Sequence, residues 1–339
     1  MVSFRLGMND GVSIEAQKWT EAFRALGHDV TLIAGEGPVD VMLPGLALAA
    51  DAPPTSDELR HALADHDVVV VENLASLPLN PRARDVLYEV LQGRDALFHH
   101  HDLPWQRAHL AHLEGPRDAP TWRHVTINER SRLELHERGI EADTIYNHFD
   151  CDPPAGDRAR TRAWLDVSDQ KVALVPTRAL TRKNIAGALR LAEELGAVFW
   201  LLGPAEDGYG DELQRRLAKA TTPTRLGLRH DMSVHDAYAA CDLVVMASLW
   251  EGFGNPTIES ITHRRPLALH PYPVSEELRS LGLRFFDLRD VESLRRELER
   301  PDEAALAANL EVVRQRLNLA DLARVLDAHW RSWGFGVGQ

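Results

Sequence analysis

The sequence has little cysteine, no long apolar run and no excess of positive charge. Only Cys151 and Cys241 occur among 339 residues, too few for a disulfide scaffold, so we expect a reducing, cytoplasmic location. No uncharged apolar run reaches the ~18 residues of a membrane helix, and the N-terminus has no apolar signal core. We therefore expect neither stable membrane insertion nor secretion. With 38 Lys and Arg against 51 Asp and Glu, the net charge of -13 argues against a nucleic-acid-binding protein.

The sequence also lacks the motifs of several nucleotide-dependent and metal-dependent enzymes. No G-x-G-x-x-G follows an early strand and no P-loop consensus is present, which argues against a dinucleotide-dependent dehydrogenase and a P-loop kinase. No HExxH or comparable spacing of metal ligands occurs either. We expect no bound metal and no required cofactor.

Short apolar runs alternate with amphipathic runs along the whole chain. The apolar runs predict strands at 30–34, 67–73, 96–101, 124–128, 171–177, 198–203, 242–248, 266–270 and 283–288. The amphipathic runs predict helices at 13–27, 56–66, 81–93, 129–139, 184–195, 209–220, 233–240, 256–263, 275–281, 291–299, 302–316 and 318–333. Because this alternation requires crossover connections, we expect an α/β protein with parallel sheets covered by helices.

The segment 149–160, with its paired prolines, is the best linker in the chain. We predict two doubly wound, Rossmann-like domains, at 1–150 and 151–317, facing each other across a cleft that binds the ligand. Residues 318–339 form a last helix with no strand after it, and its tryptophans need an apolar cover. This segment either packs on the C-terminal domain or returns to the N-terminal domain.

The segment 242–261 reads as a buried strand, a glycine-rich turn and a helix, with Asn255 expected as the helix N-cap. Gly254 allows the backbone to approach a ligand closely. Glu251 precedes the turn and Glu259 lies one turn inside the helix. Two carboxylates brought to the carboxyl ends of parallel strands suit a polyhydroxylated ligand, because each accepts several hydroxyl hydrogen bonds.

The run EGFGNPTIE at 251–259 resembles the Glu-x7-Glu motif of the retaining family-4 glycosyltransferases, which have the GT-B fold. The resemblance implies that Glu251 contacts the donor hexose, that Glu259 holds the ribose, and that backbone at Phe253, Gly254 and Asn255 lies against the sugar and diphosphate. It implies an enzyme that moves a hexose from a UDP- or GDP-hexose to a hydroxyl acceptor, without a metal and with retention of anomeric configuration.

Two positively charged residues, Arg178 and Lys183, precede the predicted helix 184–195. Positive side chains beside free helix N–H groups favour a diphosphate, because the helix dipole has the same sign. The pair also matches the diphosphate-binding Arg and Lys of the same family. Arg182, between them, is interpreted as a solvated loop residue.

Three histidines and an aspartate, His99–Asp102, end the predicted strand 96–101. Consecutive strand residues point to opposite faces, so the three histidines cannot all bind one ion. The run nevertheless leaves a metal-dependent hydrolase as an alternative from another class. The run is similar to the His-Asp pair that ends an N-domain strand in many of these transferases. The resemblance implies that His101 faces the donor sugar. His100 is the alternative if the match is shifted by one residue.

The run at 9–19 resembles the first glycine-rich loop of the N-domain of these transferases, which implies that Gly11 faces a phosphate. The family commonly has two adjacent glycines where this chain has Asp10-Gly11. A nucleotide-sugar epimerase of GT-B fold remains an alternative function. The excess of acidic over basic residues favours a soluble acceptor over a lipid. The sequence does not determine the identity of the acceptor, the nucleotide base or the hexose.

Overall fold

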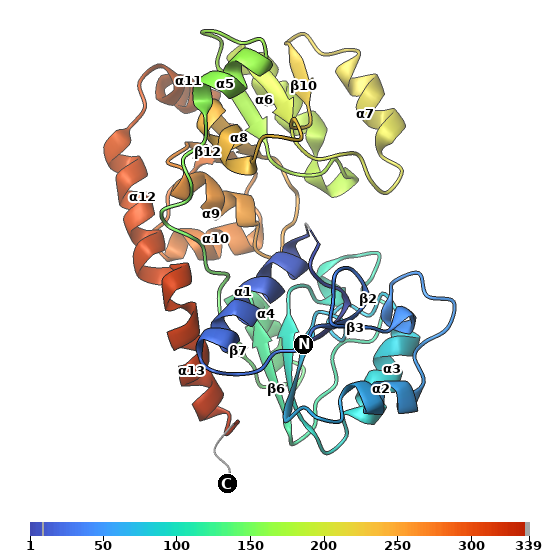
Figure 1. The fold of residues 1–339 in the computed structure, drawn as a ribbon. Helices are drawn as coiled ribbons and strands as arrows, with labels where there is room; N and C mark the ends of the chain where they lie inside the picture. The colour runs from blue at the N-terminus through green and yellow to red at the C-terminus, as the bar shows by residue number, and fades with distance from the viewer. Residues whose placement is uncertain (9, 336–339) are drawn as a thin grey trace. The chain divides into compact units, whose positions relative to one another are not determined.

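A computed structural model describes residues 1–8 and 10–335 (Figure 1). The chain divides into two compact units, which we call unit 1 and unit 2. Unit 1 comprises residues 1–148 and the C-terminal segment from Leu319, and unit 2 comprises Phe149–Asn318. Each unit contains one parallel sheet, so the predicted α/β class with two parallel-sheet units is confirmed.

The sheet of unit 1 has the order β3-β2-β1-β4-β5-β6-β7, and every neighbouring pair is parallel. Its strands are β1 (Val2–Arg5), β2 (Ile33–Glu36), β3 (Val41–Met42), β4 (Val68–Glu72), β5 (Asp95–His100), β6 (Trp122–Thr126) and β7 (Asp143–Thr144). The helices before the linker are α1 (Gly11–Ala25), α2 (Ser56–Ala62), α3 (Pro81–Val90) and α4 (Glu129–His136), with short 3-10 turns at Pro44–Leu46 and Pro104–Gln106. The order reverses between β1 and β4, and such reversal points are where open parallel sheets bind ligands.

The last helix, α13 (Leu322–Ser332), packs beside α1 in unit 1 (Figure 1). Leu326 is fully buried and joins the cluster that contains Trp19 and Phe23. The ring of Trp330 lies 5.0 Å from that of Phe23, and the indole N–H of Trp333 donates to Asp143 at 2.6 Å. The C-terminal segment therefore completes the core of unit 1.

The sheet of unit 2 has the order β10-β9-β8-β11-β12-β13, again all parallel. Its strands are β8 (Val172–Val175), β9 (Val198–Leu201), β10 (Thr224–Leu226), β11 (Leu243–Met246), β12 (Leu267–Leu269) and β13 (Phe286–Asp287). The helices are α5 (Arg158–Trp164), α6 (Ile185–Leu195), α7 (Gly210–Leu217), α8 (Val234–Ala240), α9 (Asn255–Thr262), α10 (Pro273–Ser280), α11 (Val291–Glu299) and α12 (Glu303–Arg316). β8 and β11 are neighbours, so the segments that follow them meet at one edge of the sheet.

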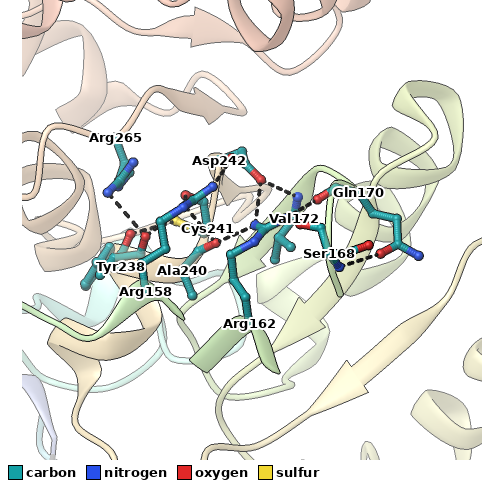
Figure 2. A network of polar contacts seen from close by, with 11 residues as sticks. Arg158, Arg162, Ser168, Gln170, Val172, Tyr238, Ala240, Cys241, Asp242 and Arg265 are labelled. Atoms are coloured by element: carbon teal, nitrogen blue, oxygen red, sulfur yellow. Dashed lines mark hydrogen bonds and ion pairs between the residues drawn. The ribbon is translucent and has the colours of Figure 1, made fainter. Parts of the chain in front are cut away.

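Helix α5 begins within the segment 149–160 that was expected to be a linker, and its arginines fix it to unit 2 (Figure 2). Arg158 donates to the carbonyl groups of Ala239, Ala240 and Cys241, at the C-terminal end of α8, and forms a 2.7 Å ion pair with Asp242. Positive side chains at that end satisfy carbonyl groups that the helix leaves unpaired. The end of the predicted linker, at 158–160, is thus part of the fold of unit 2.

The structure adds strands that the sequence pattern did not predict, namely β1, β3, β7 and β10. They have between two and four residues, too few for a periodic signal. Among the described residues, no helix combines the length and the apolar character needed to cross a membrane.

Candidate functional site

The loops after β8 and β11 meet at the carboxyl edge of the unit 2 sheet. They are joined by a backbone hydrogen bond from the N–H of Leu249 to the carbonyl of Arg182, at 2.9 Å. The predicted cations lie on the first loop and Glu251 lies on the second. Strand order alone therefore brings together residues that are about seventy positions apart.

Lys183 and Arg182 both contact the carboxylate of Glu251. Lys183 Nζ forms an ion pair with Glu251 Oε1, and Arg182 Nη1 lies 3.1 Å from Glu251 Oε2. Burial would raise the pKa of Glu251, but the two neighbouring cations outweigh burial and hold that pKa below its ordinary value. The interpretation of Arg182 as a solvated residue was wrong, because it is one of the two cations that hold Glu251.

Arg178 lies on the same loop but has a different partner. Its Nη1 is 2.6 Å from Glu206 Oε2, and about a third of its side chain is exposed. A Cβ atom placed on Gly203 would lie 2.6 Å from the Cα of Arg178, so only glycine fits beside this loop. The guanidinium of Arg178 is therefore partly exposed to solvent, and an anion can compete with Glu206 for it.

Helix α6 begins at Ile185, two residues after Lys183. Asn184 is its N-cap, with a left-handed φ of 48°, and its side-chain oxygen accepts from the N–H of Gly187 at 3.2 Å. The N-terminal end of α6 therefore adds its partial positive charge to that of Lys183. An anion at this position would meet a cation and a helix dipole of the same sign.

The turn between Glu251 and α9 depends on a glycine. Gly254 has a φ of 87°, and a Cβ atom at this position would lie 2.5 Å from the hydroxyl oxygen of Tyr272. That hydroxyl donates to the carbonyl of Phe253 at 3.0 Å. The expectation that Asn255 caps the helix was wrong by one residue, because Gly254 takes the capping position and Asn255 is the first residue of α9.

Glu259 is held by a residue that the sequence analysis did not consider. The hydroxyl group of the buried Tyr238 donates to Glu259 Oε2 at 2.7 Å. The His263 ring stacks on Tyr238, with 4.4 Å between ring centroids, and its Nδ1 lies 2.7 Å from the carbonyl of Glu259. Glu251 and Glu259 thus have separate partners, and Glu259 is the more accessible of the two.

In unit 1, the last two residues of β5, His99 and His100, and the next residue, His101, separate onto two faces as expected for a strand. His99 and His101 share one face, where both approach the buried Glu72 at the end of β4. Glu72 Oε2 lies 3.0 Å from His99 Nδ1 and 3.1 Å from His101 Nε2. The ligand atoms of these three side chains lie within 4.8 Å of one another. The sequence pattern gave no indication of Glu72, because only the register of β4 and β5 pairs it with His99.

His100 lies on the opposite face and belongs to another chain of hydrogen bonds. Its Nδ1 is 2.6 Å from the hydroxyl of Ser76, and its Nε2 is 2.9 Å from His124 Nδ1. His124 Nε2 in turn is 3.1 Å from Asp118. Burial, with the neighbouring His124, lowers the pKa of His100 well below its ordinary value. Both ring nitrogens of His100 therefore contact buried side chains of unit 1, and His100 contributes to the packing of this unit.

Gly11 begins α1, and Asp10 caps this helix by accepting from the N–H of Ser13 at 3.2 Å. Asp10 also forms a 3.1 Å ion pair with Arg5. A Cβ atom on Gly11 would meet no other atom within 4 Å, so packing does not require glycine here. Asn9, the first residue of the predicted loop, lies outside the described residues.

No protein-family model matches the chain. A mannosylglucosylglycerate synthase of Thermotoga maritima is 26% identical, with 100% of this chain and 95% of that protein covered. A mannosylglucosylglycerate synthase of Petrotoga mobilis is 24% identical, with 85% and 86% covered.

Several solved glycosyltransferase structures resemble the chain. HepE of Anabaena, in complex with UDP and glucose, has a TM-score of 0.74 at 18% identity and covers 98% of this chain and 100% of its own. This chain has the GT-B fold. Sucrose-phosphate synthase of Thermosynechococcus elongatus has a TM-score of 0.73 at 16% identity, with 97% and 95% covered. WaaG, a glycosyltransferase involved in lipopolysaccharide biosynthesis, has a TM-score of 0.67 at 14% identity, with 100% of both chains covered. None of these proteins is named as an epimerase or a hydrolase.

Proposed function

We propose that the chain is a metal-independent glycosyltransferase that moves a hexose from a nucleoside diphosphate sugar to a hydroxyl acceptor, with retention of anomeric configuration. The similarity to GT-B glycosyltransferases supports a transferase that uses nucleotide sugars. The observation that carries the proposal is the cluster of Lys183, Arg182 and Glu251 where β8 and β11 end. It puts cations, a helix N-terminus and a carboxylate within one small region.

The cations are assigned to the diphosphate. Breaking the bond between the sugar and the phosphate leaves negative charge on the departing diphosphate. Lys183 carries three N–H donors and uses one on Glu251, so it can contact a phosphate oxygen without losing that ion pair. Arg178 can exchange Glu206 for phosphate, and the N-terminal end of α6 contributes further. These groups take the part that a divalent ion plays in other transferases.

The carboxylates are assigned to hydroxyl groups. Glu251 is ionised and fixed by two cations, and each of its oxygens keeps capacity to accept from a sugar hydroxyl. Glu259, oriented by Tyr238, is assigned to the ribose. Backbone at Phe253, Gly254 and Asn255 is assigned to the sugar and the diphosphate, because Gly254 allows a close approach.

Unit 1 would supply the remaining groups. His101 is assigned to the hexose, near the carbon that reacts, and Gly11 to a phosphate at the start of α1. With retention, the acceptor attacks on the face from which the diphosphate departs. The departing phosphate is then the group placed to take the proton of the acceptor hydroxyl.

The names of the similar proteins suggest donors and acceptors to test. The synthases of Thermotoga and Petrotoga are named for a product that contains a mannosyl group, a glucosyl group and glycerate. The structure of HepE was solved in complex with UDP and glucose. We therefore propose a small, soluble glycoside that carries a carboxylate, such as glucosylglycerate, as the acceptor. GDP-mannose and UDP-glucose are the first donors to test.

The test is to incubate the purified chain with a panel of nucleotide sugars and glucosylglycerate, and to identify the products by mass spectrometry. A new glycoside formed in the presence of EDTA, with the anomeric configuration of the donor by NMR, is the expected result. Free hexose without transfer, an epimerised nucleotide sugar, or activity abolished by EDTA would each contradict a stated part of the proposal.

A further inference from the structure

The proposed function assigns no role to Glu72, a buried acidic residue of unit 1. Glu72 is fully buried at the end of β4, and its carboxylate lies within hydrogen-bond distance of two histidine rings. Burial would raise the pKa of Glu72, but the contacts with His99 and His101 overcome this and lower the pKa to about 2. The carboxylate is therefore ionised, and an ionised carboxylate only accepts hydrogen bonds.

Hydrogen bonds account for this cluster better than a metal ion does. Histidines that bind a metal almost always donate their second ring N–H to another group. His99 Nε2, the nitrogen that faces away from Glu72, is buried and has no hydrogen-bond partner among the described residues. A metal on Nδ1 would leave this N–H buried and unpaired. With hydrogen bonds instead, Nδ1 of His99 donates to Glu72, and burial keeps the pKa of His99 below its ordinary value.

The same contacts determine which nitrogen of His101 carries a proton. Because Glu72 accepts only, the 3.1 Å contact requires the proton on Nε2 of His101. In the neutral ring, Nδ1 is then an acceptor. A histidine without such a partner can exchange between its two tautomers, and a ligand hydroxyl would meet a donor in one of them and an acceptor in the other.

Other residues of unit 1 fix the position of both rings. The side-chain oxygen of Asn73 accepts from the backbone N–H of His101 at 3.1 Å and from that of Asp102 at 3.3 Å. Trp19 of α1 stacks on His99, with 4.0 Å between ring centroids. His101 is thus held at its backbone by Asn73 and at its ring by Glu72, and His99 holds Glu72 from the other side.

We propose that Glu72 is a positioning residue that keeps His101 in the Nε2–H tautomer, so that its Nδ1 is a fixed hydrogen-bond acceptor for a hydroxyl group of the donor hexose. The part of this inference that concerns the hexose rests on the proposed function. The part that concerns the tautomer does not, because it follows from contacts within unit 1. A buried carboxylate that fixes a histidine tautomer in this way has a large effect on turnover in hydrolases.

The first measurement is the tautomer of His101 in the purified chain, read from long-range nitrogen–proton NMR spectra with nitrogen-labelled histidine. In the neutral ring, a proton on Nε2 and none on Nδ1 is expected. A neutral ring with its proton on Nδ1, or a mixture of the two tautomers, would overturn the proposal. The wild-type spectrum decides this point even if a Glu72 variant does not fold. Stoichiometric zinc or another transition metal in the purified protein would also overturn it.

The second measurement compares Glu72→Gln with Ser76→Ala, a control that alters the contact of His100 on the opposite face of β5. An amide both donates and accepts, so Glu72→Gln should mix the tautomers of His101 and lower kcat at least about tenfold, with unchanged affinity for the nucleoside diphosphate. Ser76→Ala should change neither. Combining Glu72→Gln with His101→Gln should lower kcat no further than His101→Gln alone, and additive losses would overturn the proposal.

The two hypotheses fail in different ways. If the wild-type chain transfers no sugar from any donor but shows the Nε2–H tautomer that Glu72→Gln abolishes, the proposed function fails and the positioning by Glu72 stands. If transfer occurs and Glu72→Gln leaves kcat and the tautomer unchanged, the positioning role fails alone.

Discussion

At the residue scale, the two acids of the segment 251–259 differ in what holds them. Glu251 is buried and bound to two cations, so its charge is part of the folded structure. Glu259 is more accessible and its side chain accepts from Tyr238. Replacing Glu251 would leave Lys183 buried beside only Arg182, which costs stability. Glu259 is therefore the better position at which to test binding separately from folding.

We expect Glu259→Gln to weaken binding of the free nucleoside diphosphate roughly 10- to 100-fold, because a hydrogen bond to a charged group contributes about 1.5–3 kcal/mol. Gln keeps an oxygen that can accept from Tyr238, so the fold should be unchanged. Isothermal titration measures the affinity. Glu276→Gln, on an exposed position of α10, is the matched control and should bind as the wild type does. Equal affinities in all three proteins would remove the ribose assignment.

Lys183 offers a test of the diphosphate assignment. Lys183→Met keeps the apolar stem and leaves Arg182 to hold Glu251, so circular dichroism should be unchanged. Loss of one electrostatic contact to the developing charge should raise the barrier by about 2–4 kcal/mol, which lowers kcat/KM by roughly 30- to 1,000-fold. Lys219→Met, at an exposed position, is the control. Wild-type kinetics in Lys183→Met would contradict the assignment.

At the element scale, β5 carries alternating functions on its two faces. His99 and His101 face Glu72, whereas His100 faces Ser76 and His124. The period of two that all strands share separates these histidines. One face is assigned to the site and the other to the stability of unit 1, so the two roles can be tested on one strand.

We expect the stability of unit 1 to fall as the pH falls below about 6.5. The pKa of His100 is well below its ordinary value in the folded chain, so the folded state keeps it neutral while the unfolded state binds a proton. His100→Gln should lower Tm but reduce the loss of Tm between pH 7.5 and pH 5.5. His99 and His148, whose pKa values are also lowered by burial, should leave a residual loss.

Thermal unfolding at pH 7.5, 6.5 and 5.5 provides the measurement. His136→Gln replaces an exposed histidine and should keep the pH dependence of the wild type. If His100→Gln loses as much Tm on acidification as the wild type, then His100 is not a source of the acid sensitivity.

At the scale of the whole molecule, each unit has its own parallel sheet and its own part of the proposed site. The cations and acids assigned to the nucleotide and sugar lie in unit 2, and His101 and Gly11 lie in unit 1. The chain enters unit 2 at Phe149 and returns to unit 1 at Leu319. Helix α13 is therefore a component of unit 1, although the whole of unit 2 separates it from the rest of unit 1 in the sequence.

Leu326→Asp tests this division in the full chain. The change puts an unpaired charge in the core beside α1 and should destabilise unit 1 by roughly 3 kcal/mol or more. Affinity for the nucleoside diphosphate, assigned to unit 2, should fall much less. Ala328→Asp adds the same charge at an exposed position of α13 and is the control. Calorimetry and titration give the two readouts, and a change confined to affinity would contradict the division.

The sequence by itself determined the alternation of strands and helices and the two parallel sheets. These features depend on local periodicity. It also indicated Glu251 and Glu259, because the resemblance at 251–259 is carried by nine consecutive residues.

Only the tertiary structure decided which charges meet. Arg182 binds Glu251 across 69 positions because β8 and β11 are neighbours, and Glu72 meets His99 because the register of β4 and β5 pairs them. Packing of α13 on α1 likewise depends on two apolar faces more than 290 positions apart. Strand order and register are set by the burial of whole faces, which no local pattern specifies.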